Sequence, residues 1–172
     1  RGAGGGGGRR AARGSSHEGC QSTACRQARG VCEVCQRWLK RTAKHKMDPP
    51  KYQPSLAKDI PVAPLAPTRE ADNEKLKTGE NSIRVIAGDE ATYGVKGAAT
   101  PRTPVELLDI RIAAQDASLD VHGPEGHTTL GFVRRGALTV VEEHTPVTPR
   151  GVATQTPGGA GARLSAQATR KE

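Results

Sequence analysis

The sequence predicts an all-β fold with disordered N- and C-terminal tails, and three observations support that prediction. Between residues 82 and 141, short apolar and β-branched runs are separated by turn residues, as in antiparallel barrels and sandwiches. Prolines at four positions exclude a helix over residues 51–67. Aromatic residues make up only 2% of the 172 residues, and many of the 21 glycines lie near the ends, so we expect a small core.

Two segments show the strand pattern most clearly. Ser82–Ala87 is rich in β-branched residues and is followed by Gly88-Asp89, which predicts a strand and then a turn. Val105–Ile112 alternates with a period of two, which places three apolar residues on one face and Asp109 and Arg111 on the other. The three apolar residues are Leu108, Ile110 and Ile112.

Shorter strands are expected on both sides of these segments. Ser118–Val121 places Leu119 and Val121 on one face. Leu130–Val133 and Ala137–Val141 flank a turn-forming Arg-Arg-Gly sequence, which predicts a hairpin. The remaining expectations are a strand at Cys35–Lys40 and a turn at Pro124-Glu125-Gly126.

The positive charge is concentrated at the N-terminus. Residues 1–51 carry 12 Lys/Arg and 3 Asp/Glu, whereas residues 52–172 carry 14 and 15, so the net charge of +8 resides in the first segment. We interpret this segment as a solvated tail, and the alternative is a nucleic-acid-binding arm. No apolar run approaches the ~18–20 residues that span a bilayer, and residues 1–16 lack the apolar stretch of a secretory signal. We therefore expect a cytoplasmic protein that does not contact membranes.

Four cysteines near the N-terminus offer one candidate metal site. Cys20, Cys25, Cys32 and Cys35 have the spacing Cys-x4-Cys-x6-Cys-x2-Cys, with His17 nearby. Cys32-x-x-Cys35 is an acceptable half of a zinc site, but the linker of six residues is shorter than the usual spacing of about 12–20. Free thiols are the interpretation we favour, and zinc bound to the cysteines is the alternative.

Four segments in a consistent order resemble the pirin family of bicupin proteins. They are QRWLKRTAKHKMDPPKYQ (residues 36–53), AKDIPV (57–62), IRVIAGDEATYGVKGAATPRTPVELLDIRI (83–112) and LDVHGPEGHTTLGFVRRGALTV (119–140). In pirins the first two correspond to the bridge between the two cupin barrels, and the last two correspond to the second barrel. The resemblance therefore implies a partial cupin β-barrel of the jelly-roll type.

The resemblance also divides the chain into four parts. We expect residues 1–35 to be a disordered basic tail with the cysteines, and residues 36–80 to be the inter-barrel bridge and a proline-rich strap. Residues 81–141 are a partial C-terminal cupin, and residues 142–172 are a disordered tail, because the family pattern stops near Val141.

The iron site of pirins is expected to be missing. Family members hold iron in the N-terminal barrel on three histidines and a glutamate, whereas residues 1–35 contain a single histidine, His17. We therefore interpret the chain as a fragment without the metal-binding barrel. The resemblance implies two activities for full-length members, iron-dependent quercetin 2,3-dioxygenase and redox-sensitive transcription cofactor, and we expect neither from this chain alone. Its expected partner is the missing N-terminal cupin half or another protein.

The second barrel offers no replacement for that metal site. Metal cupins place two histidines two residues apart, a glutamate shortly after, and a third histidine on a neighbouring strand. If His127 is taken as the first ligand, the other positions hold Thr129 and Val133 or Arg134. If Gly136 ends the strand, the ligand positions hold Gly123, Glu125 and Thr129. We therefore predict no metal ligand, no cofactor and no catalytic residue, and we place His122 and His127 at a turn and a rim.

Overall fold

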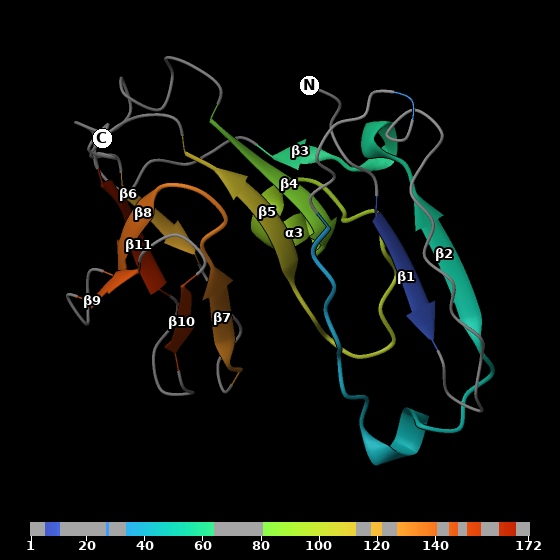
Figure 1. The fold of residues 1–172 in the computed structure, drawn as a ribbon. Helices are drawn as coiled ribbons and strands as arrows, with labels where there is room; N and C mark the ends of the chain where they lie inside the picture. The colour runs from blue at the N-terminus through green and yellow to red at the C-terminus, as the bar shows by residue number, and fades with distance from the viewer. Residues whose placement is uncertain are drawn as a thin grey trace.

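The computed structural model describes residues 6–10, 27, 34–63, 81–112, 118–121, 127–140, 145–147, 151–155 and 162–167. These residues are mostly strands, with two 3₁₀ turns and one four-residue helix (Figure 1). The elements are β1 (Gly6–Arg10), η1 (Ala43–His45), β2 (Lys51–Ser55), η2 (Ala57–Asp59), β3 (Val62–Ala63), β4 (Ser82–Ala87), α3 (Glu90–Tyr93), β5 (Leu107–Arg111), β6 (Ser118–Val121), β7 (Thr129–Phe132), β8 (Ala137–Val140), β9 (Thr145–Val147), β10 (Val152–Gln155) and β11 (Ala162–Gln167).

The central sheet consists of β3, β4 and β5, paired antiparallel in that order. Along β4, buried and partly exposed residues alternate, because successive side chains of a strand point to opposite faces. Val85 is fully buried at 0% exposure, between Ile83 and Ala87 on the same face. The three apolar residues predicted for one face, Leu108, Ile110 and Ile112, pack against the core, but residues 107–110 of β5 are all partly buried, so burial along β5 does not alternate. The strand predicted over residues 82–87 is therefore confirmed with the same bounds.

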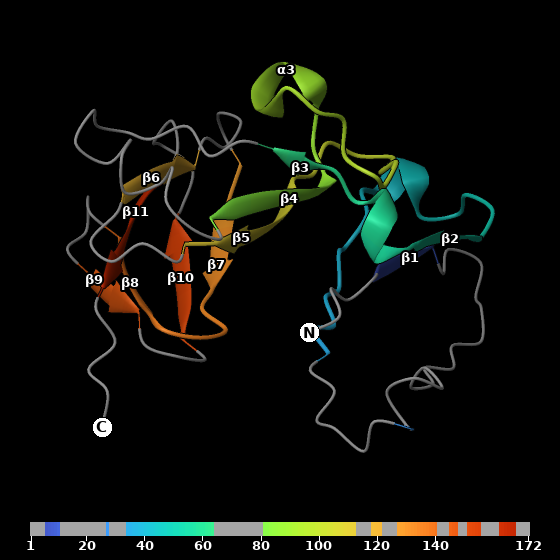
Figure 2. The same cartoon turned by 90° about the horizontal axis from the view of Figure 1, so that it is seen from above.

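The C-terminal strands form a second group beside the central sheet. One sheet has the order β6-β11-β8-β9, and a two-stranded sheet pairs β10 with β7 (Figure 2). Leu119 of β6, only 2% exposed, joins the core cluster of Ala63, Ile83 and Val85, so it connects the two groups. A smaller cluster buries Val133 and Val147. The chain is thus an all-β protein with its main core between the central sheet and the C-terminal strands.

A third pair of strands lies on the other side of the central sheet. β1 pairs antiparallel with β2, from Gly6 opposite Ser55 to Arg10 opposite Lys51 (Figures 1 and 2). β2 is held to the rest of the fold through the loop that precedes β5, as described below. The structure therefore places a strand inside the N-terminal stretch for which the composition predicts disorder.

The predicted hairpin between residues 130 and 141 is wrong. Both strands exist, as β7 and β8, but β7 pairs with β10 whereas β8 pairs with β9 and β11. The chain changes sheets at residues 133–136, where Val133 is buried and Gly136 has a φ of 77°. Strands that switch sheets at a corner are a general feature of packed β architectures. The predicted Arg-Arg-Gly turn is therefore present, but it joins strands of two different sheets.

Two further expectations differ from the structure. The stretch Cys35–Lys40 forms no strand, and its side chains are exposed. After Glu142, where we expected a disordered tail, β9, β10 and β11 pair with β8, β7 and β6. β9 pairs with the strand directly before it, whereas β10 and β11 pair with segments that are distant in sequence. Local composition does not report such distant partners. The residues expected as a turn at 124–126 lie outside the described part.

The loop between β4 and β5 folds back closely on β4. Asp89 caps α3 by accepting a hydrogen bond from Thr92 N at 2.9 Å, and Gly94 ends the helix in the left-handed conformation with a φ of 69°. Gly97 N donates to Gly88 O at 3.0 Å. Tyr93 OH donates to Glu106 Oε2 at 2.7 Å. Burial is the main reason that the pKa of Tyr93 lies above its ordinary value, and the hydrogen bond to Glu106 raises it further. The loop is therefore fixed at both of its ends.

None of the helices among the described residues is long and apolar enough to cross a membrane.

Candidate functional site

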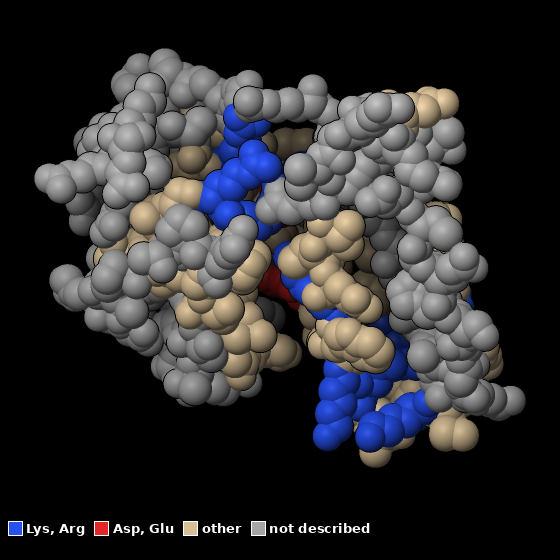
Figure 3. Space-filling view, in the orientation of Figure 1, with Lys and Arg blue, Asp and Glu red and all other residues tan. Residues whose placement is uncertain are grey.

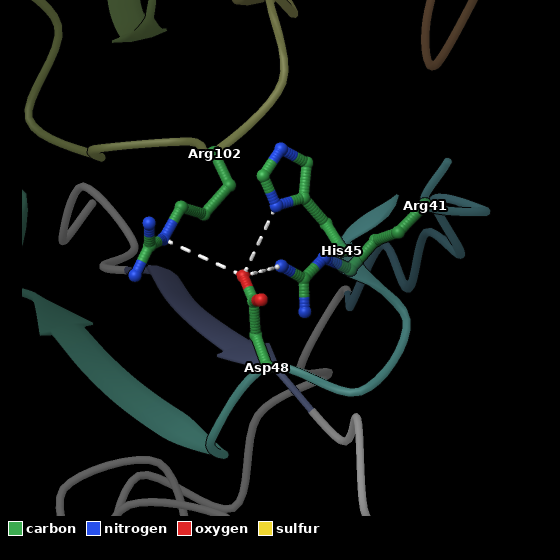
Figure 4. Close-up of polar contacts among 4 residues, drawn as sticks. All are labelled: Arg41, His45, Asp48 and Arg102. Carbon is green, nitrogen blue, oxygen red and sulfur yellow. Dashed lines mark hydrogen bonds and ion pairs between the residues drawn. The ribbon is translucent and has the colours of Figure 1, made fainter. Parts of the chain in front are cut away.

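Asp48 is the centre of a charged cluster that joins two distant parts of the chain (Figure 4). Arg41 Nη2 donates to Asp48 Oδ2 at 2.7 Å, and His45 Nδ1 lies 3.3 Å from the same oxygen. Arg102 Nε, from the loop that precedes β5, lies 3.6 Å from that oxygen. These four residues are called the Asp48 cluster below.

The local backbone explains why residues 41, 45 and 48 converge. His45 N donates to Thr42 O at 3.0 Å, which closes the 3₁₀ turn η1. This turn brings Arg41 and Asp48 into contact although they are seven positions apart. Pro49 and Pro50 follow directly, and two consecutive prolines prevent the turn from continuing as a helix. Asp48 is therefore held at the point where the chain enters β2.

Gln53 of β2 reinforces the same junction. Its Nε2 donates to Ala98 O at 2.8 Å, and its Oε1 accepts from Thr100 N at 3.2 Å. One amide side chain thus satisfies a backbone acceptor and a backbone donor of the loop that carries Arg102. Together, Gln53 and the Asp48 cluster attach residues 41–53 to residues 98–102.

The cluster has more positive than negative charge. Two guanidinium groups and one imidazole surround a single carboxylate, and the Arg41 side chain is only 14% exposed. Desolvation favours the neutral acid, but the Arg41 hydrogen bond and the charges of Arg102, Arg41 and His45 outweigh it, so the pKa of Asp48 is held below its ordinary value. Among the described residues, Arg41 Nη1 is buried without a hydrogen-bond partner. The arrangement stabilises a carboxylate and disfavours a metal cation at the same oxygen.

Replacing Asp48 by asparagine is expected to lower the Tm by several degrees at neutral pH, because the guanidinium groups of Arg41 and Arg102 then meet without a counter-charge. The folded-state pKa of Asp48 is lowered, so its stabilisation is present above the ordinary carboxyl pKa of about 4 and is lost as the pH falls through the lowered value. Thermal unfolding at several pH values checks both points. The difference between wild type and Asp48→Asn should shrink in acid.

Asp59→Asn is the matched control for this substitution, since Asp59 is exposed in η2, outside the cluster. It should leave the Tm within about one degree of wild type, as is usual for an exposed surface substitution. Equal effects of the two substitutions would show that the cluster makes no specific contribution.

The described residues do not fit the iron site that a metal cupin would require. No group of three or more His, Cys, Asp or Glu side chains within the described ranges is arranged to hold a metal ion. His45 and Asp48 lie in contact, but the carboxylate oxygen of Asp48 already contacts Arg41 and Arg102. Two cations at that oxygen would repel a third. No step of a metal-dependent reaction is therefore derived for this part of the chain.

The described residues among those that the cupin spacing singled out form no group of metal ligands. His127 is exposed, Val133 is buried in the small cluster, and Arg134 Nη1 lies 3.3 Å from Asp109 Oδ1. Arg84 contacts the other carboxylate oxygen of Asp109 at 3.6 Å, so Arg134 takes part in an ion-pair group. The positions outside the described part are Cys20, Cys25, Cys32, His17, His122, Gly123 and Glu125.

The zinc alternative is not tested by the structure. Of its four cysteines, Cys35 alone lies within the described ranges, where it is an exposed free thiol. The alternative therefore stays a prediction, to be checked by metal analysis of the purified protein.

Sequence reasoning missed the Asp48 cluster entirely. A signal was nevertheless present, because Asp48 is the only acidic residue between positions 34 and 51 and follows a run of basic residues. A lone acid in such a run, placed before two prolines, is a candidate ion-pair partner. The contribution of Arg102 could not have been found in this way, since it lies more than 50 positions further along the chain.

The strand content, the sheet switch at residues 133–136 and the core between two groups of strands define an all-β protein with a cupin-like fold. The chain is homologous to the curated protein "Putative quercetin 2,3-dioxygenase" of Pseudomonas aeruginosa, with 36% identity over 134 residues that cover 77% of this chain and 42% of that protein. It also matches the crystal structure of quercetin 2,3-dioxygenase from Acinetobacter baumannii at a TM-score of 0.59 and 33% identity, over 73% of this chain and 38% of that one.

The chain spans about two fifths of the length of each of these proteins. No family model matches the chain. The predicted all-β, cupin-like fold class is confirmed by this structural match, and the resemblance to quercetinase-like cupins is confirmed as homology.

Proposed function

We propose that this chain is the metal-free cupin module of a pirin-type bicupin related to quercetin 2,3-dioxygenases. The observation that carries the proposal is the homology, which extends over 77% of this chain while it covers 42% of the relative. The segments at residues 36–53, 57–62, 83–112 and 119–140 contribute further support, because they resemble the bridge and the second barrel of pirins. In this proposal residues 36–80 form the bridge and strap, and residues 81–141 form the cupin module.

The role proposed for the module is structural rather than catalytic. Within the module, Asp109 pairs with Arg84 and Arg134, and the described residues contain no group of three or more His, Cys, Asp or Glu side chains that could hold a metal ion. Full-length relatives would supply iron chemistry from a separate barrel, and the module would stabilise that barrel as its partner. Residues 41–53 and 98–102 hold the proposed bridge to the module.

The first test of the proposal is an activity measurement on the purified full chain after incubation with ferrous iron. Oxygen consumption and loss of the quercetin absorbance are expected to stay at the level of iron alone, because the described residues provide no ligand set for the metal. The Acinetobacter baumannii protein serves as the positive control. Turnover above the background of free iron would contradict the proposal.

A second measurement tests the partner. Mixing this chain with the separately produced part of the Pseudomonas aeruginosa relative that this chain does not match should give a complex on size-exclusion chromatography. The bridge-side contact should be sensitive to Asp48→Asn, since the cluster fixes the bridge. The absence of any complex would argue against a bicupin origin of the module.

A further inference from the structure

Basic side chains of the segment that leads from residue 34 into β2 form a strongly basic surface. Its members are exposed and come from two parts of the chain that the Asp48 cluster brings together. They are Arg37, Lys40, Lys44, Lys46, Lys51 and Arg102, and they are called the bridge surface below. In Figure 3, Lys and Arg side chains gather at the lower end of the visible face, where Figure 1 places the coiled ribbon of η1.

Within the described segment 34–51, basic side chains outnumber acidic ones. Asp48 is the only acidic residue from position 34 to 51, and its carboxylate is already occupied by Arg41, His45 and Arg102. The exposed lysines of this segment therefore give its surface a positive electrostatic potential. Such a surface attracts polyanions, and phosphate groups are the usual polyanionic ligand of clustered lysine and arginine.

An exposed aromatic ring lies within the same segment. Trp38 is 89% exposed and stands between Arg37 and Lys40 in the sequence. Tryptophan is normally largely buried in folded proteins, so a ring left in water is informative. Aromatic side chains between basic ones are the combination that binds unpaired bases, which stack on the ring while the phosphates contact the cations.

We propose that the bridge surface, with Trp38 as the stacking platform, binds single-stranded nucleic acid. Residues 34–42 form no helix or strand, so the segment offers no rigid element that could enter a duplex groove. An irregular segment with several cations and one exposed ring instead fits a flexible strand whose bases can turn outward. This location differs from the cysteine-containing tail, and it does not depend on the dioxygenase relationship.

The chain provides its own reporter for this binding. Trp38 is the only tryptophan among the 172 residues, so quenching of its fluorescence reports contact at the proposed position. Titration of the full chain with an oligothymidylate of about 20 nucleotides should quench the emission at low salt. The logarithm of the binding constant should fall with the logarithm of salt concentration, with a slope of no more than about −4 for six cationic contacts.

Two variants separate the cations from the ring. Lys44→Gln with Lys46→Gln should make the salt slope shallower by about 1 to 1.5, since each lost phosphate contact removes about 0.7. Lys58→Gln with Lys96→Gln changes the net charge equally at exposed lysines outside the bridge surface, and it should leave the slope unchanged. Trp38→Ala, followed by anisotropy of a labelled oligonucleotide, should weaken binding about 5- to 100-fold with the same slope.

Three results would overturn the proposal. One is the absence of salt-dependent quenching, and another is an equal response of the two lysine pairs, which would place binding elsewhere on the chain. The third is that polyglutamate binds as tightly as the oligothymidylate and that Trp38→Ala does not weaken its binding. This result would identify a surface for polyanions in general or for acidic proteins. Circular dichroism of each variant verifies that the fold is kept.

Discussion

Replacing Leu119 by alanine is expected to lower the free energy of unfolding by about 2–5 kcal/mol, the usual cost of removing a buried leucine side chain. Leu119 is 2% exposed and packs with Ala63, Ile83 and Val85. It belongs to β6, whereas its neighbours belong to β3 and β4, so the cavity would open between the two groups of strands. Equilibrium unfolding in urea measures the change.

Leu56→Ala is the matched control for Leu119→Ala. Leu56 is 57% exposed, so the same chemical change removes little buried surface there and should cost less than about 1 kcal/mol. A loss at Leu119 that is no larger than the loss at Leu56 would show that β6 does not pack on the central sheet. Isoleucine at position 119 should restore most of the stability, because it conserves volume.

Gly97→Ala is expected to destabilise the protein by about 1–3 kcal/mol, as overpacking of a closely packed position usually does. A β-carbon at this position would lie 2.7 Å from Ala87 Cα and from Gly88 N, and 2.9 Å from Ala87 C. All three are backbone atoms, so no side chain can rotate away. The loop would have to move from β4, and the Gly97 N to Gly88 O hydrogen bond of 3.0 Å would be lost. Thermal or urea unfolding measures the effect.

Gly94 provides the comparison that distinguishes crowding from backbone conformation. Its φ of 69° disfavours other residues, yet a β-carbon added to it would meet no atom within 4 Å. Gly94→Ala and Gly94→Ser should therefore cost similar amounts, whereas Gly97→Ser should cost more than Gly97→Ala. A flat response to side-chain size at position 97 would contradict the close approach of the loop to β4.

Much of the central sheet could be predicted because its signals are local. The β-branched run over Ser82–Ala87 and the alternation of Val105–Ile112 each contain the information for one strand and its buried face. The pairing of β7 and β8 could not be predicted in the same way. A short turn between two apolar runs favours a hairpin, but the strands find longer-range partners in β10 and β11. Strand partners depend on tertiary packing, which local periodicity does not encode.

The candidate site was even less accessible from the sequence. Cupin spacing directed attention to His127 and its neighbours, and the structure leaves His127 exposed and Val133 in a small apolar cluster. The cluster that the structure does form depends on a 3₁₀ turn and on Arg102 from a distant loop. Neither feature has a sequence motif. Homology identifies the class of protein, whereas the contacts around Asp48 are visible only in the three-dimensional structure.

The order of strands in the four-stranded sheet has a consequence for how the chain acquires its structure. β11 lies between β6 and β8, and Leu164 of β11 is the register partner of both Leu119 and Val140. During synthesis, β6 and β8 therefore cannot pair with β11, the strand between them, until residues 162–167 have left the ribosome. Contacts of such large sequence separation slow folding and leave strand edges exposed to other chains in the meantime. Yield on expression should therefore depend more on chaperone supply and temperature than on the final stability of the folded protein.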